Sequence, residues 1–259
     1  MQEIFKKIIL INKKEGETPL EALESFRAKN KKYKYIKMTY AGRLDPLVSG
    51  LLLVLAGETT KQKEKYLGLS KEYQFTVLFG FATDTYDILG KVTKVARGDF
   101  KQDLTTKELE KRIKLNLKFF TGKFKQKYPM YSSKTVAGKP LFTYARAGKQ
   151  VESPEHEVNV KSLQFFKLKK ISAKKLLENI ERRIAKVHGD FRQKEILKIW
   201  RRELIKKTPK SFFVADFHIK CGSGTYVRGI ADSLGGHVGV PALALSIKRT
   251  KIGNWSQVG

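Results

Sequence analysis

Cysteine and acidic residues are scarce in this chain, and long apolar runs are missing. Its 259 residues include one cysteine, Cys221, so an intramolecular disulfide is impossible and a cysteine-based zinc site is not expected. The four histidines (156, 188, 218 and 237) show no metal-ligand spacing. No apolar stretch is long enough to span a bilayer, and the first residues lack the apolar core of a signal peptide. We therefore expect a cytoplasmic protein that uses no metal and enters no membrane.

The deficit of acidic residues leaves a large positive charge. Lys and Arg total 53 against 25 Asp and Glu, which gives a formal net charge of +28. An excess of this size favours a polyanionic partner, and nucleic acid is the first candidate. An anionic membrane surface and a basic surface with no specific partner are the alternatives. Hydrophobic residues make up 41% of the chain, which is enough for a substantial core.

The hydrophobic pattern predicts both strands and helices along the chain. Thr18, Pro19 and Glu21 have the spacing of a helix N-terminus with a capping box, so a helix should run from there to about residue 29. A final strand, turn, helix and strand are predicted between residues 212 and 253. The other expected elements are strands over 5–11, 51–56, 72–81 and 158–168 and a helix over 105–116.

Two basic segments interrupt this pattern. Residues 121–154 are rich in lysine and tyrosine and lack a clean period, so we expect a long functional loop region. Residues 167–210 contain sixteen Lys or Arg and five Asp or Glu, and their apolar residues recur at helical spacing. They predict a basic helical hairpin over 170–207, which is either a packed helix pair with a solvated outer face or an arm that grips RNA.

One carboxylate occupies an unusual position in the stretch TYAGRLDPLVSGLLLVLAGETT. Asp45 precedes Pro46, which disfavours helix at Asp45, and an apolar run follows directly. Such an aspartate can be a nucleophile, although an Asp before Pro is also a common turn former. Ionisation in an apolar setting needs a nearby cation. Arg228 in GSGTYVRGI is one candidate, and Arg43 is closer in sequence.

Two tyrosines could lie near this aspartate. Tyr40 precedes the Asp45 segment by five residues, and Tyr73 lies on the strand predicted over 72–81. A strand tyrosine can be ordinary packing, but beside a carboxylate that processes a base it could stack on that base.

In combination, four motifs resemble the TruB family of tRNA pseudouridine synthases. They are AGRLDPLVSGLLLVLAGETTK, KEYQFTVLFGFATDTYDILGKV, YPMYSSKTVAGKPLFTYARAG and GTYVRGIADSLG. The resemblance covers most of the chain. It implies an α+β fold with the pseudouridine synthase core: a mixed, mostly antiparallel sheet with flanking helices, here carrying the basic helical insertion. We expect a single catalytic domain over residues 1–259, a monomer, without the C-terminal RNA-binding domain of the PUA type that many relatives carry.

The resemblance also implies a reaction and roles for residues. The family isomerises the uridine at position 55 in the T-arm loop of tRNA, with no metal and no cofactor. By analogy Asp45 is the nucleophile, Tyr73 stacks on the flipped uracil and is a candidate to take the C5 proton, and Arg228 pairs with Asp45. The expected RNA-binding residues are Tyr40, Arg43, Lys13, Tyr131, Lys134, Lys139 and Arg146.

Two departures from the family pattern bear on these roles. Tyr40 stands where the family has a histidine that fills the gap left by the flipped base, and a tyrosine cannot become cationic there. The hairpin over 170–207 is longer than the usual strand connection. We expect its deletion to weaken tRNA binding and leave the fold intact. A non-catalytic tRNA-binding protein on the same scaffold, or an RluA-like pseudouridine synthase acting on another RNA, remain alternatives.

Overall fold

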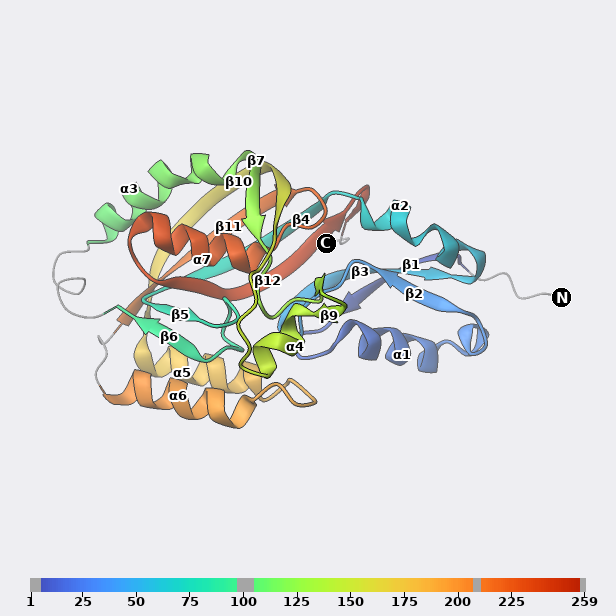
Figure 1. Ribbon diagram of the computed structural model, residues 1–259, viewed down its shortest axis with the longest axis horizontal. Helices are drawn as coiled ribbons and strands as arrows, with labels where there is room; N and C mark the ends of the chain where they lie inside the picture. The colour runs from blue at the N-terminus through green and yellow to red at the C-terminus, as the bar shows by residue number, and fades with distance from the viewer. Residues whose placement is uncertain (1–5, 97–104, 207–210, 257–259) are drawn as a thin grey trace.

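A large mixed sheet runs through the centre of the computed structural model, which describes residues 6–96, 105–206 and 211–256 (Figure 1). Its main path has the spatial order β1-β3-β12-β4-β11-β10-β7, and β2 and β13 pair with β3 and β12. Within the described residues, β3 and β12 run parallel and the other neighbours in this sheet run antiparallel, which confirms the predicted α+β class. These strands are β1 (Ile8–Lys13), β2 (Met38–Ala41), β3 (Val48–Ala56), β4 (Lys71–Phe79), β7 (Gly122–Lys127), β10 (Glu155–Ser172), β11 (Ser211–Cys221), β12 (Ala242–Ile252) and β13 (Trp255–Ser256).

Helices and two small hairpins surround the sheet. The two helices expected near residues 18–29 and 105–116 form as predicted, each capped by a threonine side chain: Thr18 accepts from the Glu21 amide and Thr105 from the Glu108 amide. The two-stranded hairpins pair β5 (Phe81–Thr83) with β6 (Val92–Val95) and β8 (Thr135–Val136) with β9 (Lys139–Pro140). The helices are α1 (Pro19–Lys29), α2 (Lys63–Leu67), α3 (Thr106–Asn116), α4 (Leu141–Arg146), α5 (Ala173–Ile184), α6 (Gln193–Lys206) and α7 (Val227–Val238).

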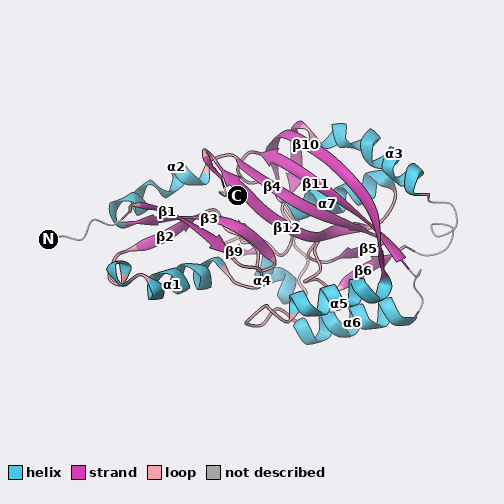
Figure 2. Ribbon diagram, turned by 180° about the vertical axis from the view of Figure 1, so that it is seen from behind, coloured by secondary structure: helices cyan, strands magenta, loops and turns pink. Residues whose placement is uncertain are grey.

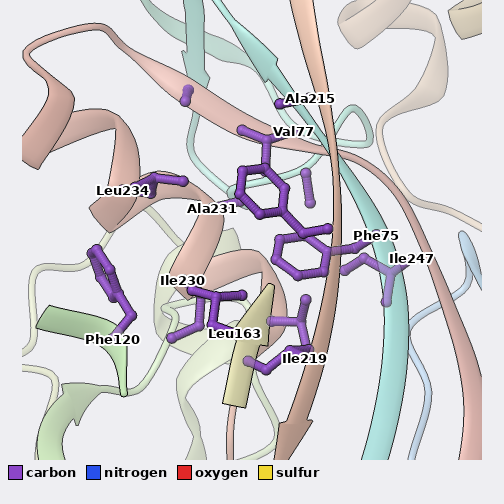
Figure 3. Close-up of a cluster of buried hydrophobic side chains, with 14 of the residues drawn as sticks. Phe75, Val77, Phe120, Leu163, Ala215, Ile219, Ile230, Ala231, Leu234 and Ile247 are labelled. Carbon is purple, nitrogen blue, oxygen red and sulfur yellow. The ribbon is translucent and has the colours of Figure 1, made fainter. Parts of the chain in front are cut away.

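Successive side chains of the central strands alternate between two separate hydrophobic cores. Phe75 and Val77 of β4 pack with Ile230 and Leu234 of α7 in one cluster (Figure 3). Leu78, the next residue of β4, belongs instead to a cluster with α5 and α6. Because successive side chains of a strand point to opposite faces, α7 and the α5–α6 pair cover opposite faces of the sheet.

The basic hairpin is part of the second core. Figure 2 shows α5 and α6 side by side at one end of the sheet. Ile180 of α5 and Trp200 of α6 are fully buried, and the Trp200 ring lies edge-on to Phe81 at 5.0 Å between centroids. The predicted helical hairpin is therefore confirmed, but its apolar side covers the sheet. Its deletion would expose this core, so the structure predicts that the fold is destabilised without the hairpin, contrary to the expectation from the sequence.

The segment 121–154 contains more regular structure than its sequence predicts. Its first residues form β7, the edge strand that pairs with β10. Lys123, Lys125 and Lys127 alternate with Phe124 and Gln126 along this strand. Since the strand is short and its outer positions are lysines, its period-two pattern is weak in the sequence. The segment is therefore only partly a loop region, and the helix α4 follows within it.

Candidate active site

A cleft of about 880 Å³ lies beside the β2–β3 connection. Residues from all four motifs that resemble the TruB family line it. Asp45 lies on its wall, in the segment between β2 and β3. The carbonyl of Asp45 accepts a hydrogen bond from the Val48 amide at 3.0 Å, so the residue does form a turn. Its carboxylate is not used in that turn and is 41% exposed to the cleft. The two readings of Asp45, turn former and reactive group, are thus compatible.

Arg228 is the cation that pairs with Asp45. Its Nε lies 2.8 Å from Asp45 Oδ2, although 183 residues separate the two in sequence. Its other donors reach backbone carbonyls, with Nη1 2.7 Å from the Thr85 oxygen and Nη2 2.9 Å from the Tyr131 oxygen. Arg228 is 2% exposed and lies in the first turn of α7, so a surface ion pair is ruled out. Burial acts to lower the pKa of Arg228, but the charge of Asp45 raises it above its ordinary value, so the guanidinium stays charged.

The nearer arginine in sequence takes another partner. Arg43 also lines the cleft, but its Nη1 donates to the Ser133 hydroxyl at 2.6 Å. It is exposed to solvent.

Tyr73 of β4 lies in the cleft wall and is 9% exposed. Burial raises the pKa of its phenol, so this tyrosine is neutral at neutral pH. A buried arginine, Arg249 of β12, supports the same wall and donates to the Leu51 carbonyl at 2.6 Å. The close approach of β12 to β3 at this point requires Gly50, where an added Cβ would overlap the carbonyl of Arg249.

The residues predicted to bind RNA divide into two groups. Tyr40, Arg43, Tyr131, Lys134 and Arg146 all line the cleft. Lys139 is exposed on β9 and does not line it.

Lys13 has a position different from the one predicted. It is completely buried, and its ammonium donates to the carbonyls of Lys14, Glu17 and Pro46 at 2.9, 2.6 and 3.1 Å. Burial lowers the pKa of Lys13 to about 8. With its three donors used internally, Lys13 holds the turn that carries Asp45 and is not available to an RNA phosphate.

Several residues of the site were not predicted. Asp87 lines the cleft near Arg228, and burial raises its pKa to about 6 against the effect of the Arg228 charge. Its carboxylate accepts from the Thr85 hydroxyl at 2.7 Å and the Leu89 amide at 2.9 Å. The motif TDTYDILG already contained this residue. Phe191 and Arg192, at the tip of the α5–α6 hairpin, also line the cleft, and no motif pointed to them.

Clusters of metal-ligating side chains and membrane-spanning helices are both absent from the described residues. Across 6–96, 105–206 and 211–256, no three or more His, Cys, Asp or Glu side chains are grouped as a metal site would require. None of the helices in these ranges has the length and hydropathy needed to cross a bilayer.

Comparison with known proteins places this geometry in a family. A family model described as TruB family pseudouridylate synthase (N terminal domain) matches residues 29–182. A tRNA pseudouridine synthase B of Lactobacillus acidophilus is 33% identical over 93% of this chain, and that of Aquifex aeolicus is 29% identical over 94%. In both cases the matched region spans 67% of the relative's length.

Two solved structures contain a chain with a similar fold. A Cbf5-Nop10-Gar1 complex contains a chain that superposes with a TM-score of 0.56 over 97% of this chain and 50% of its own length, at 16% identity. An H/ACA RNP bound to a substrate RNA containing 2'-deoxyuridine gives a TM-score of 0.53. With the Asp45–Arg228 pair in its cleft and the family's sequence along its length, the chain belongs to the TruB family of pseudouridylate synthases and is an enzyme.

Proposed function

We propose that this enzyme converts uridine to pseudouridine in the T-arm loop of tRNA, at position 55, with Asp45 as the nucleophile. The observation that carries the proposal is the Asp45 carboxylate, half exposed to the cleft and held at 2.8 Å by the buried Arg228. The buried guanidinium orients the carboxylate at a space of about 880 Å³, which is large enough for a nucleotide.

Base flipping is part of this proposal. Asp45 and Tyr73 line the same cleft, and enzymes that act on a base take it out of the stack to reach it. Extruding a base costs a few kcal/mol, which stacking on an aromatic ring can offset. Tyr73 is the stacking ring in this proposal. Its raised pKa favours the neutral phenol over the phenolate, so it is poorly suited to act as an anionic base.

The reaction breaks the bond from the ribose to N1 of the uracil and forms a bond from the ribose to C5. Asp45 forms a transient bond to the uridine as the N1 bond breaks, and the detached uracil rotates in the cleft. The bond to Asp45 breaks as the ribose bonds to C5, after which C5 loses its proton and N1 gains one, so that the product is an isomer of the substrate. No redox step occurs, and the cleft has to provide a nucleophile, a surface for stacking, a route for the C5 proton to leave and positive charge along the RNA.

The decisive experiment maps pseudouridine by position in an unmodified tRNA transcript and in a T-arm minihelix, with wild type beside Asp45→Asn. Asn has the shape of Asp without its charge, so we expect modification at the T-loop uridine that disappears in the variant while tRNA affinity changes little. Modification that persists in Asp45→Asn would contradict the nucleophile.

Two other outcomes identify the alternatives. Tight tRNA binding without any modification by wild type would indicate a non-catalytic scaffold, and Tyr40 in the family's histidine position would be the first residue to restore. Modification of another RNA but not of the minihelix would indicate an RluA-like specificity.

A further inference from the structure

The tip of the α5–α6 hairpin is built into the cleft wall. The segment between Ile184 and Gln193 brings Phe191 and Arg192 to the same cleft that holds Asp45. Side-chain bonds fix its shape, since the Gln193 amide nitrogen donates to the Gly189 carbonyl at 2.8 Å and its oxygen accepts from the Phe191 amide at 2.9 Å. Arg192 itself has a φ of 64°, in the left-handed region that few non-glycine residues occupy.

Arg192 joins two loops that are far apart in sequence. Its Nη1 lies 2.7 Å from Asp84 Oδ2 and its Nη2 lies 3.3 Å from Asp84 Oδ1, which is a two-point contact. The same guanidinium lies 4.3 Å from the centre of the Tyr131 ring. Both members of the ion pair are more than three-quarters buried, with side-chain exposures of 21% and 24%.

These two loops are the ones that hold Arg228. Asp84 precedes Thr85, whose carbonyl accepts from Arg228 Nη1, and the Tyr131 carbonyl accepts from Arg228 Nη2. The remaining donor, Nε, is the one that contacts Asp45. A shift of either carbonyl would therefore rotate or release the guanidinium that fixes Asp45.

Two residues of α6 also contact the Asp84 loop and the residues that follow it. Glu195 of α6 forms an ion pair with Lys91 at 2.7 Å, and the Trp200 indole donates to the Ile88 carbonyl at 3.1 Å. Arg146 of α4 donates to the Asp190 carbonyl of the tip at 3.2 Å. The inserted hairpin thus contacts both loops, and Arg192 is the side chain that touches both at once.

We propose that Arg192 is a positioning residue for the reaction, which clamps the loops of Thr85 and Tyr131 so that Arg228 holds Asp45 in its reactive orientation. This inference rests on the proposed function. It assigns a role in the site to the inserted hairpin, which lies outside the motifs that carry the family resemblance. Arg192 would act through Arg228 and without contact to the reacting base.

The test compares Arg192→Gln, Arg192→Lys and Asp84→Asn with a matched control. Arg112→Gln is that control for the loss of one arginine charge, since Arg112 forms an ion pair with Glu108 at 2.9 Å within α3 and does not line the cleft. Single-turnover rates at saturating tRNA, tRNA dissociation constants at several salt concentrations and thermal unfolding are measured for each protein.

We expect Arg192→Gln to lower the single-turnover rate at least tenfold while the dissociation constant changes less than about threefold. The slope of log Kd against log salt should stay that of wild type, because no phosphate contact is lost. Arg192→Lys should recover part of the rate, and Asp84→Asn combined with Arg192→Gln should cost little more than either change alone. Arg112→Gln should match wild type in all measurements.

A second readout does not depend on activity. The Arg228 Nε proton, assigned by its loss in Arg228→Lys, should exchange with solvent at least ten times faster in Arg192→Gln than in wild type. An unchanged exchange rate overturns the clamp even if the wild-type enzyme modifies no tRNA, whereas inactivity of wild type alone overturns the proposed function. An unchanged turnover rate with weaker binding and a salt slope reduced by about one would also overturn the clamp, since it would make Arg192 a phosphate contact.

Discussion

At the scale of single residues, the site depends on how many acceptors Arg228 must satisfy. Its three nitrogens reach a carboxylate and two carbonyls that lie on three different segments of the chain. A guanidinium presents donors in a fixed planar fork, whereas a lysine presents one compact ammonium on a flexible stem. The fork is therefore needed to connect Asp45 to both loops.

Arg228→Lys is expected to lower the single-turnover rate at least a hundredfold, because one ammonium cannot hold Asp45 and both carbonyls. Leaving a buried carbonyl without a donor should also reduce the free energy of unfolding by about 1–3 kcal/mol. Rates on tRNA and urea unfolding measure the two effects. A variant with the wild-type rate would show that positive charge alone suffices at this position.

A second residue-scale prediction concerns Asp232 on α7. Burial raises the pKa of Asp232 from 3.8 to about 6, with Lys94 opposing the shift. Between these pH values the folded protein binds more protons than the unfolded chain, so the free energy of unfolding falls as pH rises from about 4 to about 6. Asn cannot ionise, so Asp232→Asn should remove this part of the decline.

The gain at pH 7 should be about 1 kcal/mol relative to pH 4, reduced from the full value of the shift because Asp232 is partly exposed. Part of the slope should remain in the variant, since burial also raises the pKa of Asp87 to about 6. Urea unfolding at both pH values measures the difference between the two proteins. Parallel pH dependences of wild type and variant would contradict the prediction.

At the scale of elements, segments with a clean period were predictable, whereas the edge of the sheet formed by β7 was not. The capping residues Thr18 and Thr105 locate the starts of α1 and α3 from the sequence alone. The strand β7 escaped prediction because it is a short edge strand with lysines facing water. Contacts between segments far apart in the sequence were also not predicted, since local sequence patterns do not show that the hairpin tip contacts the Asp84 loop.

The residues of the candidate site were also only partly predictable from the sequence. Motifs identified Asp45, Tyr73 and Arg228, which the structure brings to one cleft. They also placed Lys13 at the RNA, whereas the structure buries its ammonium among three carbonyls. A lysine in a sequence carries no mark of whether its charge meets a phosphate or the backbone, because burial depends on the whole fold.

The core role of the hairpin predicts large effects from Trp200. Trp200→Ala removes a fully buried ring that packs on Phe81, so the free energy of unfolding should fall by about 3–5 kcal/mol. Trp200→Phe keeps most of the ring but loses the bond to the Ile88 carbonyl, at a cost of about 1–2 kcal/mol. Urea unfolding measures both. Wild-type stability of Trp200→Ala would show that the hairpin does not contribute to the core.

At the scale of the whole molecule, the net positive charge is the feature that bears most on tRNA binding. The formal net charge of +28 predicts tRNA affinity that weakens steeply with salt, because binding releases condensed counterions from the RNA. Charge spread evenly over the surface and charge concentrated on the hairpin would give similar salt dependences, so position has to be tested separately.

A matched pair of double variants makes that test. Lys194 and Lys198 are exposed on α6, four residues apart, and Lys107 and Lys111 are exposed at the same spacing on α3. Lys194→Glu with Lys198→Glu should raise the tRNA dissociation constant about tenfold, if the outer face of the hairpin lies along the RNA. The same reversal on α3 changes the net charge equally and should raise it less than about threefold. Equal effects of the two pairs would show that the hairpin is no special contact.

The parallel pairing of β3 with β12 has a consequence for synthesis of the protein on the ribosome. Asp45 leaves the ribosome 183 residues ahead of Arg228, and β3 must wait still longer for the strand that carries Arg249. At about 5–20 residues per second this delay is on the order of 10–40 seconds. During that time the nascent chain can pair β3 with β1 and β2, but β3 lacks its neighbour β12, Asp45 lacks Arg228, and the cleft is incomplete. The reactive site is therefore completed only after β12 has been synthesised, and partial chains that end before Arg228 should be both inactive and prone to aggregation.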